Sequence, residues 1–377
     1  MQLPKVNPNH SDSPQTPLKK RSRFVAWFLK HKKATIPVTL ILLAGIAYTA
    51  VFFLFINQPP EESKPAKPEP AKLEEVVEEP KFYSPLTGSQ VPEEADTTKP
   101  VTAVILENTP AARPQSGLQE AELVYEAITE GGITRFLALY QQNKPELIGP
   151  VRSLRPFFID WLAPYNASIL HVGGSAEALT EIRNGNYRDL DQFFHAGTYW
   201  RSTDRYAPHN VYTNSSNVDN LNTSLGYTSS DPAPLPRTEE APTESDDTSV
   251  ANTVTVNMSG HLYNSSWHYE PTTGQYNRAQ AGAAHTDRER GQVSAEVVVV
   301  LNQTFQAIEG GRYAYGTTGS GQGYVFYKGK ATPINWHKQD RISQFTFTDS
   351  SGAEYKLPQG TTWISIVPNQ QGAPTWQ

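Results

Sequence analysis

An uncharged run of 21 residues constrains this chain more than any other feature of its sequence. Residues 36–56 read IPVTLILLAGIAYTAVFFLFI and have no polar face. A helix rises about 1.5 Å per residue, so a helix of this length crosses the roughly 30 Å hydrocarbon core of a bilayer. A cleaved signal peptide fits less well, because the run is long and no small-residue cleavage site follows it. We therefore predict a single transmembrane helix over residues 36–56.

The charges on either side of this run predict its orientation. Seven lysines and arginines lie within residues 19–33, whereas the first charged residues after the run are Glu61 and Glu62. Positive charge is retained on the cytoplasmic side, so residues 1–35 are predicted to be a basic cytoplasmic tail. The rest of the chain is then extracytoplasmic, with its C-terminal domains outside a cell membrane.

Composition excludes several classes of function. Residues 61–377 hold 24 of the 32 basic residues but 37 of the 38 acidic ones, and a surface this acidic argues against nucleic acid as a partner. The chain has no cysteine, which excludes disulfides, thiolate metal sites and a cysteine-linked lipid anchor. No cofactor motif is found: the glycine-rich segment 316–323 lacks the GK[ST] ending of a phosphate loop.

Two low-complexity segments divide the extracytoplasmic part. Residues 57–81 are rich in Pro, Glu and Lys and are predicted to form a stalk, and residues 228–250 are predicted to be a disordered acidic linker. Between and after them we expect a mixed α/β domain over residues 82–227 and a β-rich domain over residues 251–377. The expected fold class is α+β, preceded by the transmembrane helix.

A predicted hairpin in the first domain carries charged residues. The runs AELVYEAITE and ITRFLALY flank a Gly-Gly pair at 131–132, which favours a two-residue turn. That turn would pair Glu126 with Leu137 and place Glu126, Glu130 and Arg135 on one mostly apolar face. Two interpretations are open. The charges form a structural ion pair, or Glu126 is an acid/base whose properties Arg135 tunes.

Arginine predominates over lysine in the first domain. Residues 101–212 contain eight arginines and one lysine, and arginine is preferred for forked contacts to carboxylate or phosphate. Pairing with the acids of the domain is the structural alternative. The candidate anion ligands are Arg135, Arg152, Arg155, Arg201 and Arg205, with Ser153 and Asn210 beside them in the sequence.

A strand–turn–helix junction is predicted at residues 171–175, HVGGS. Its backbone amides and the following helix, which Ser175 would cap, could form an anion cradle from Gly173, Gly174 and Ser175; a capped tight turn is the plainer alternative. His171 and His209 are candidate proton carriers. Their spacing is not typical of a metal site, so no metal is predicted.

Many of these motifs occur together in one known family. The first set is ARPQSGL at 112–118, VYEA at 124–127, EGGITRF at 130–136, IGPVRS at 148–153, RP at 155–156, HVGGS at 171–175 and APHN at 207–210. The second set is WHY at 267–269, YNR at 276–278, HTD at 285–287, GYVF at 323–326 and the segment from Leu357 through Trp363 and Ile364. In this order they resemble the YerB-like family, known as domain of unknown function 3048.

This resemblance implies an extracytoplasmic protein of the bacterial envelope, commonly a lipoprotein, without an established activity. The chain departs from the family in lacking the lipoprotein cysteine, so the helix at 36–56 would be the anchor. The linker at 228–250 is also longer and more polar than a minimal connection.

Three hypotheses about function follow. The first is an envelope protein that binds an anionic ligand, such as a cell-wall glycan, a polyol phosphate or a peptide carboxylate, through the arginines, with His171, Ser175 and His209 completing the pocket. The second is a cell-wall hydrolase or glycopolymer transferase in which Glu126 is the acid/base and His171 or His209 the second proton carrier, while the arginines stabilise charge in the transition state. The third is a regulator that controls a neighbouring membrane enzyme through its transmembrane helix. The sequence leaves open whether the chain is an enzyme.

Overall fold

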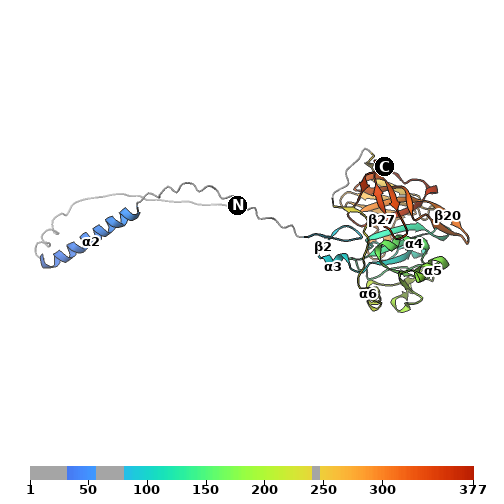
Figure 1. The fold of residues 1–377 in the computed structure, drawn as a ribbon, viewed down its shortest axis with the longest axis horizontal. Coiled ribbons are helices and arrows are strands. Elements are labelled where there is room, and N and C mark those ends of the chain that lie inside the picture. The colour runs from blue at the N-terminus through green and yellow to red at the C-terminus, as the bar shows by residue number, and fades with distance from the viewer. Residues whose placement is uncertain (1–31, 57–79, 240–246) are drawn as a thin grey trace, which may run out of the picture. The chain divides into compact units, whose positions relative to one another are not determined.

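The structure is a computed structural model that describes residues 32–56, 80–239 and 247–377 (Figure 1). The chain divides into two units, Met1–Glu78 and Glu79–Gln377. The predicted tail up to residue 31 and the predicted stalk up to residue 79 lie outside the described residues.

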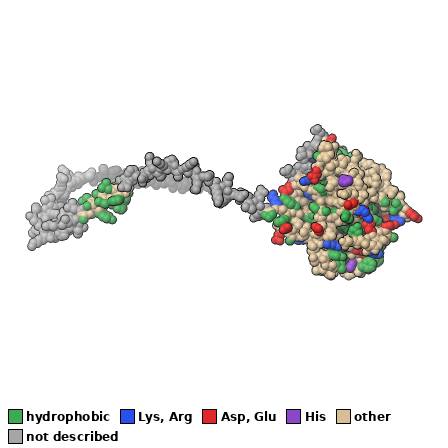
Figure 2. All heavy atoms as spheres, viewed as in Figure 1, with side chains coloured by type: hydrophobic (Ala, Val, Ile, Leu, Met, Phe, Trp, Pro, Cys, Tyr) green, Lys and Arg blue, Asp and Glu red, His purple; other side chains and the backbone are tan. Residues whose placement is uncertain are grey.

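In the first unit, residues 36–56 belong to the continuous helix α2 (Lys32–Ile56). Figure 2 shows that α2 presents hydrophobic side chains where its atoms are coloured. Judged by length and apolarity together, no helix among the described residues qualifies as a membrane span.

A twelve-stranded sheet organises the second unit. Eleven strands form one continuous path, and the twelfth, β11 (Ser249–Val250), pairs with β23. The path runs β25 (Glu354–Tyr355), β24 (Thr346–Thr348), β23 (Lys330–Lys338), β22 (Gly319–Tyr327), β19 (Val297–Gln303), β27 (Thr362–Pro368), β4 (Leu123–Ile128), β5 (Thr134–Tyr140), β3 (Thr102–Glu107), β6 (Ser168–His171) and β7 (Arg188–Asp191). The fold is therefore α+β and dominated by strands, as the sequence predicts.

A second sheet and five short strand pairs complete the β structure. The second sheet has six strands: β15 (Ala283–Ala284), β14 (Gln275–Gln280), β13 (Ser265–Glu270), β12 (Thr253–Val256) and β28 (Thr375–Trp376), with β18 (Ser294–Ala295) on β14. The pairs are β1 (Phe82–Tyr83) with β2 (Gln90–Val91), β8 (Trp200–Arg201) with β9 (Val211–Tyr212), β10 (Arg237–Thr238) with β26 (Leu357–Pro358), β16 (Thr286–Asp287) with β17 (Gly291–Gln292), and β20 (Phe305–Ile308) with β21 (Arg312–Tyr315).

Helices are few and short in this unit. The α-helices are α3 (Glu94–Thr97), α4 (Pro156–Leu162), α5 (Ala176–Asn184) and α6 (Ser215–Ser224). Single 3-10 turns occur at η1 (Pro110–Ala112), η2 (Glu130–Gly132), η3 (Ala163–Tyr165), η4 (Ala196–Thr198) and η5 (Asn369–Gln371). Ser175 caps α5 by accepting a hydrogen bond from the Ala178 amide, which confirms the predicted helix start.

The large sheet crosses the boundary expected between two domains. Strand β27, from the C-terminal part, pairs in parallel with β4 from the N-terminal part, from Thr362↔Leu123 to Ser365↔Glu126. In Figure 1 the orange-to-red strands continue directly into the cyan-to-green ones. The two segments expected as separate domains therefore form one compact unit with a shared sheet.

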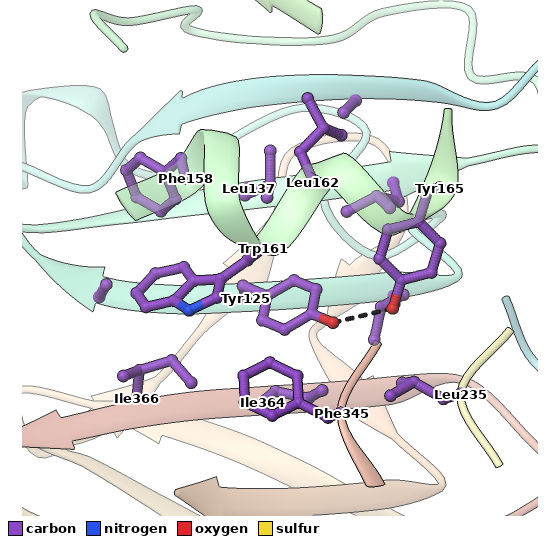
Figure 3. Close-up of a cluster of buried hydrophobic side chains, with 14 of the residues drawn as sticks. Tyr125, Leu137, Phe158, Trp161, Leu162, Tyr165, Leu235, Phe345, Ile364 and Ile366 are labelled. Carbon is purple, nitrogen blue, oxygen red and sulfur yellow. Dashed lines mark hydrogen bonds between the residues drawn. The ribbon is translucent and has the colours of Figure 1, made fainter. Parts of the chain in front are cut away.

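Helix α4 covers one face of this shared sheet. Figure 3 shows Phe158 and Trp161 of α4 lying over Tyr125 of β4 and Ile364 of β27. The Tyr125 hydroxyl is 2.8 Å from that of Tyr165, so the two buried phenols satisfy each other. Strands buried on both faces read as unbroken apolar runs, and the segment VTAVILE at residues 101–107, which contains β3, is such a run.

The second sheet covers the other face of the large sheet. Trp267 and Tyr276 from β13 and β14 pack with Phe136 and Trp363 from the large sheet. The Trp267 and Trp363 rings meet edge to face, with centroids 5.4 Å apart. Apolar side chains from both halves of the chain thus enclose a common core.

The described part of the expected linker is ordered, which differs from the prediction for residues 228–250. Leu235 is buried, and Arg237 donates to the Leu86 carbonyl at 2.6 Å and to the Pro358 carbonyl at 2.8 Å. Strand β10, which contains Arg237, pairs with β26. Low-complexity composition misleads here because this segment finds its partners in the rest of the folded unit.

The predicted hairpin exists, but its register is wrong by one residue. Glu126 lies opposite Phe136, not Leu137, and Ile128 lies opposite Thr134. The connection is a five-residue loop that contains η2, and both of its glycines have positive φ. An odd shift moves a side chain to the other face, so Glu126 and Arg135 point to opposite faces of the sheet.

Candidate functional site

Strands β3, β6 and β7 run parallel and end at the same edge of the large sheet. Their registers, Thr102↔Ser168 and Ser168↔Arg188, bring Glu107, His171 and Asp191 to their carboxyl ends. Ligands of open sheets with parallel strands bind outside the carboxyl ends of the strands. A ligand site is therefore expected at this edge.

At this edge the segment 150–154 is inserted between β3 and β6. On one side, the Arg152 amide donates to the Ile105 carbonyl at 2.7 Å. On the other side, the Val172 amide donates to the Arg152 carbonyl at 3.0 Å, and the Leu154 amide donates to the Gly173 carbonyl at 3.0 Å. The insertion fixes the backbone of Arg152, and α4 begins directly after Arg155.

The first charged group at this edge joins Glu107, Arg152 and His209. The Glu107 side chain is 1% exposed and forms an ion pair with Arg152, whose side chain is 23% exposed. His209 Nδ1 is 3.5 Å from the Glu107 carboxylate and 3.2 Å from the Thr109 hydroxyl. Glu107 is thus a buried acid, and its two partners, Arg152 and His209, reach the surface.

The second charged group joins Arg135, Glu130 and Arg155. Arg155 contacts both oxygens of Glu130, including an Nη2–Oε2 bond of 2.6 Å. Burial alone would raise the pKa of Glu130, but the hydrogen bond and charge of Arg155 lower it. Arg135 Nη1 is 3.5 Å from Glu130 and 3.2 Å from the Ser153 carbonyl.

Arg135 is held in an unusual state. The residue is 5% exposed, and its Nε has no hydrogen-bond partner among the described residues. Burial and, secondarily, the charge of Arg155 lower the pKa of Arg135 to about 10. A buried guanidinium with an unmade hydrogen bond gains strongly from an anionic partner.

We call the residues Glu107, Glu130, Arg135, Arg152, Arg155 and His209 the arginine site. Three guanidinium groups face two carboxylates, which leaves an excess of positive charge. A cavity of about 120 Å³ adjoins it, lined by Arg155, Ser175, Arg312 and Tyr313 together with the acids Asp160 and Glu177. The arrangement can bind a small anionic group by forked hydrogen bonds.

The expected anion cradle is instead filled by the protein. The Gly173 amide donates to Asp191 Oδ1 at 3.0 Å, and the Ser175 amide donates to the Leu154 carbonyl at 3.2 Å. Gly174 forms a bridge with Leu154. These backbone groups shape the edge, and only the Ser175 side of the junction lines a cavity.

His171 is a structural residue in this geometry. Its side chain is completely buried, and its ring nitrogens lie 2.8 Å from the Gly173 carbonyl and 2.8 Å from Asp189. A proton carrier must reach the group that it serves. The structure therefore gives no route for the predicted catalytic role of His171.

Arg201, Arg205 and Asn210 hold the loop that carries His209. Arg201 donates to the Asn210 side chain at 2.8 Å, and Asn210 donates to the Ser202 carbonyl at 3.0 Å. Arg205 donates to the Ala111 carbonyl at 3.1 Å. Their hydrogen bonds serve the protein, so the structure separates them from the arginine site.

Glu126 does not belong to the arginine site either. It is fully buried between the two sheets, where Arg278 Nη2 donates to both of its oxygens at 3.0 and 2.9 Å. Thr134 and Trp363 donate to it at 3.0 and 3.1 Å. The predicted pairing with Arg135 is thus wrong, and a carboxylate enclosed in this way has no access to a substrate.

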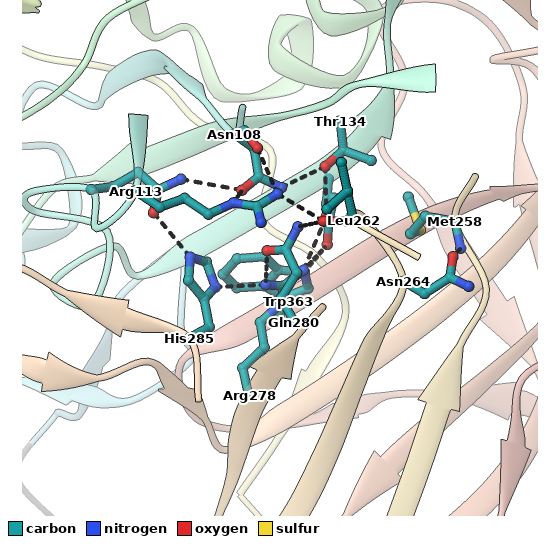
Figure 4. A network of polar contacts seen from close by, with 12 residues as sticks. Asn108, Arg113, Thr134, Met258, Leu262, Asn264, Arg278, Gln280, His285 and Trp363 are labelled. Carbon is teal, nitrogen blue, oxygen red and sulfur yellow. Dashed lines mark hydrogen bonds and ion pairs between the residues drawn. The ribbon is translucent and has the colours of Figure 1, made fainter. Parts of the chain in front are cut away.

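Figure 4 shows the polar network around Arg278. Arg278 Nη1 donates to Gln280 at 2.7 Å and to His285 Nδ1 at 2.6 Å, and the other His285 nitrogen bonds Gln115 at 2.9 Å. Burial, followed by the charge of Arg278, holds the pKa of His285 well below its usual value. Neutral His285 and charged Arg278 therefore tie the C-terminal part to the N-terminal part.

The sequence analysis missed Glu107 as a member of the arginine site, and it missed the pairing of Glu130 with Arg155 there. Glu107 is the last residue of the VTAVILE strand, and an acid that ends a buried strand is a signal for the edge of a sheet. Among the described residues, no three His, Asp or Glu side chains converge into a metal set.

Comparisons with known proteins agree with the motif order. Residues 86–228 match the family described as protein of unknown function (DUF3048), N-terminal domain, and residues 254–364 match its C-terminal domain. A Bacillus subtilis (strain 168) protein named "Putative lipoprotein YerB" is 31% identical over 330 residues, which cover 86% of this chain and 94% of that protein. The crystal structure of YerB from Bacillus subtilis superposes with a TM-score of 0.68 at 29% identity, covering 76% of this chain and 96% of that one.

Proposed function

The chain belongs to the YerB-like family of proteins of unknown function (DUF3048), and we propose that it is a membrane-anchored, extracytoplasmic envelope protein that binds an anionic cell-wall ligand through the arginine site. One observation carries this proposal. Arg152 and Arg155 reach the surface beside the buried Arg135, and among the described residues these three guanidinium groups face only the carboxylates of Glu107 and Glu130, so the site carries an excess of positive charge.

The proposed anchor is the helix over residues 36–56. Its support is the run of 21 uncharged residues, the cluster of basic residues before it and the acidic residues after it. The relative from Bacillus subtilis is described as a lipoprotein, whereas this chain has no cysteine to carry a lipid. A helix in place of the lipid would keep the folded unit outside the membrane. In spheroplasts, protease added outside should remove Glu79–Gln377 and leave the N-terminal tail protected; protection of both ends would overturn this topology.

The chemistry of the arginine site favours phosphate or carboxylate groups. Forked guanidinium groups match phosphate and carboxylate alike. Arg152 and His209 are partly exposed at the edge where the parallel strands have their carboxyl ends, so the site can accept one group of a long polymer. Polyol phosphates and peptide carboxylates carry such groups at regular spacing. The alternative of a hydrolase or transferase acting through Glu126 gains no support, because Glu126 and His171 are enclosed.

Calorimetric titration of the full chain in nanodiscs tests the proposal, with poly(glycerol phosphate) and inorganic pyrophosphate as probes. We expect saturable binding that Arg135→Gln and Arg152→Lys each weaken at least tenfold, because both lose forked hydrogen bonds. Arg290→Lys is the matched control, since Arg290 pairs with Glu120 on the surface outside the site. No binding of either probe at millimolar concentration, or equal binding by Arg152→Lys, would overturn the anionic ligand.

A further inference from the structure

A second cavity lies beside the point where pairing between β22 and β19 ends. Pairing between these strands ends at Gly323↔Leu301, whereas β22 continues to pair with β23 as far as Gly319↔Lys338. A groove of about 470 Å³ lies beside this end of the pairing, walled by the glycine-rich segment before Gly323 and by the segment around η5. Its volume is in the range of small-ligand sites.

Among the residues that the structure describes, no charged side chain lines this groove. It instead brings together hydroxyl and amide side chains from three separate segments: Asn302, Thr304, Thr318, Ser320, Gln322 and Asn369. Within the described ranges, Thr304, Thr318, Gln322 and Asn369 make no side-chain hydrogen bond to protein. Each group can both donate and accept, so the groove offers an unused set of neutral hydrogen bonds.

The walls are held in place by bonds that leave Thr304, Thr318, Gln322 and Asn369 unused. Asn302 donates to the Gly372 carbonyl at 3.0 Å, and the Trp336 indole donates to the Asn302 carbonyl at 3.0 Å. A Cβ at Gly321 would lie 2.6 Å from that indole nitrogen, so only glycine permits this close approach. The groove is therefore formed before any ligand arrives, which reduces the entropy lost on binding.

We propose that this groove is a second binding site, for an uncharged oligosaccharide. Sugar hydroxyls donate and accept like the groups that line it, whereas an anion would find no cation there. An extended peptide fits less well, because a strand needs about 4.8 Å on each side. The Gly321 Cβ position lies only 2.8 Å from the Asn302 carbonyl, so β19 and β22 leave no such space between them.

The test uses the full chain in nanodiscs and three probes: the β-1,4-linked tetramer of N-acetylglucosamine, maltotetraose and an uncharged Gly/Ser/Thr heptapeptide. We expect saturable calorimetric binding of at least one sugar. Comparing the two affinities distinguishes a ligand built of N-acetylated sugars from one built of simple hexoses. The double variant Gln322→Ala/Asn369→Ala should bind about tenfold more weakly, because two hydrogen bonds are lost. Gln306→Ala is the matched control, since Gln306 is exposed on β20 outside the groove.

This inference stands apart from the proposed function. Sugar binding should survive Arg152→Lys, and pyrophosphate binding should survive Gln322→Ala/Asn369→Ala. If the double variant does not fold, Thr318→Trp, which fills the groove from an exposed position, takes its place. The proposal is overturned if neither sugar binds at millimolar concentration, if the groove variants bind sugar like the parent, if binding needs Arg152, or if only the peptide binds.

Discussion

Glu126 and Arg278 form a fully buried ion pair that joins residues 152 positions apart in the sequence. The Arg278 guanidinium also lies 4.7 Å from the Trp363 ring centroid and 5.7 Å from that of Trp267. The pair connects the two family-matched segments between the sheets. Glu126 and Arg278 both belong to family motifs, and their ion pair explains their presence structurally, without a catalytic role.

Breaking this pair should cost stability. We expect Glu126→Gln to lower the free energy of unfolding by about 3–5 kcal/mol, because it leaves Arg278 charged and buried without its counterion. Urea unfolding of the full chain, followed by tryptophan fluorescence, measures the loss. The surface variant Glu120→Gln, which removes the partner of Arg290, should cost less than about 1 kcal/mol. A Glu126→Gln protein as stable as the parent would contradict the structural role.

Removing a carboxylate from the arginine site should strengthen anion binding. Glu130→Gln frees Arg155 and Arg135 from their shared counterion, and since Glu130 is partly exposed we expect a gain of about threefold to tenfold in affinity for pyrophosphate. Titration calorimetry at low salt measures it. The gain should shrink at higher ionic strength as charges are screened. Glu354→Gln, an exposed control outside the site, should change nothing, and weaker binding by Glu130→Gln would contradict the assigned electrostatics.

The sequence predicts local features of this fold well. The apolar run that becomes β3 and the serine that caps α5 were readable, because each depends on neighbouring residues only. The arginines at 135, 152 and 155 were identified by their type, and the structure does place them together. Glu130 stands beside Arg135 in the predicted hairpin, whereas the contact of Glu107 with Arg152 depends on segments that meet only in the folded chain.

Long-range features could not be read in the same way. The Gly-Gly pair predicts a turn, but a three-residue difference in loop length changed the register and moved Glu126 to the face opposite Arg135. The true partner, Arg278, lies on β14, and no local pattern connects it with β4. The parallel pairing of β4 with β27 likewise joins two strands that lie far apart in the sequence, and no local pattern specifies it.

Stability should fall in mild acid because of His285. Its pKa in the folded protein is well below the usual 6.5, so between these two values only the unfolded chain binds a proton there. Stability from this group is present above pH 6.5 and declines as pH falls below it, by at most about 1.4 kcal/mol per pH unit. Urea titrations at pH 7 and pH 5 should show this loss in the parent and a smaller loss in His285→Gln. The exposed His268→Gln should behave like the parent, and an unchanged pH dependence in His285→Gln would refute the assignment.

The shared sheet predicts one unfolding transition for Glu79–Gln377. The pairing of β27 with β4 and the buried Arg278 network join the two halves in one core. Each half therefore completes the core of the other, and neither half should stay folded without the other. Hydrogen exchange of the full chain should give β4 and β19 the same opening free energy, because both flank β27. Ile364→Asp, a charge in the centre of β27, should lower protection in β4 and β19 equally, whereas Ile342→Asp on the exposed surface should leave both unchanged. Loss of protection in β19 alone would mean that the N-terminal part folds independently.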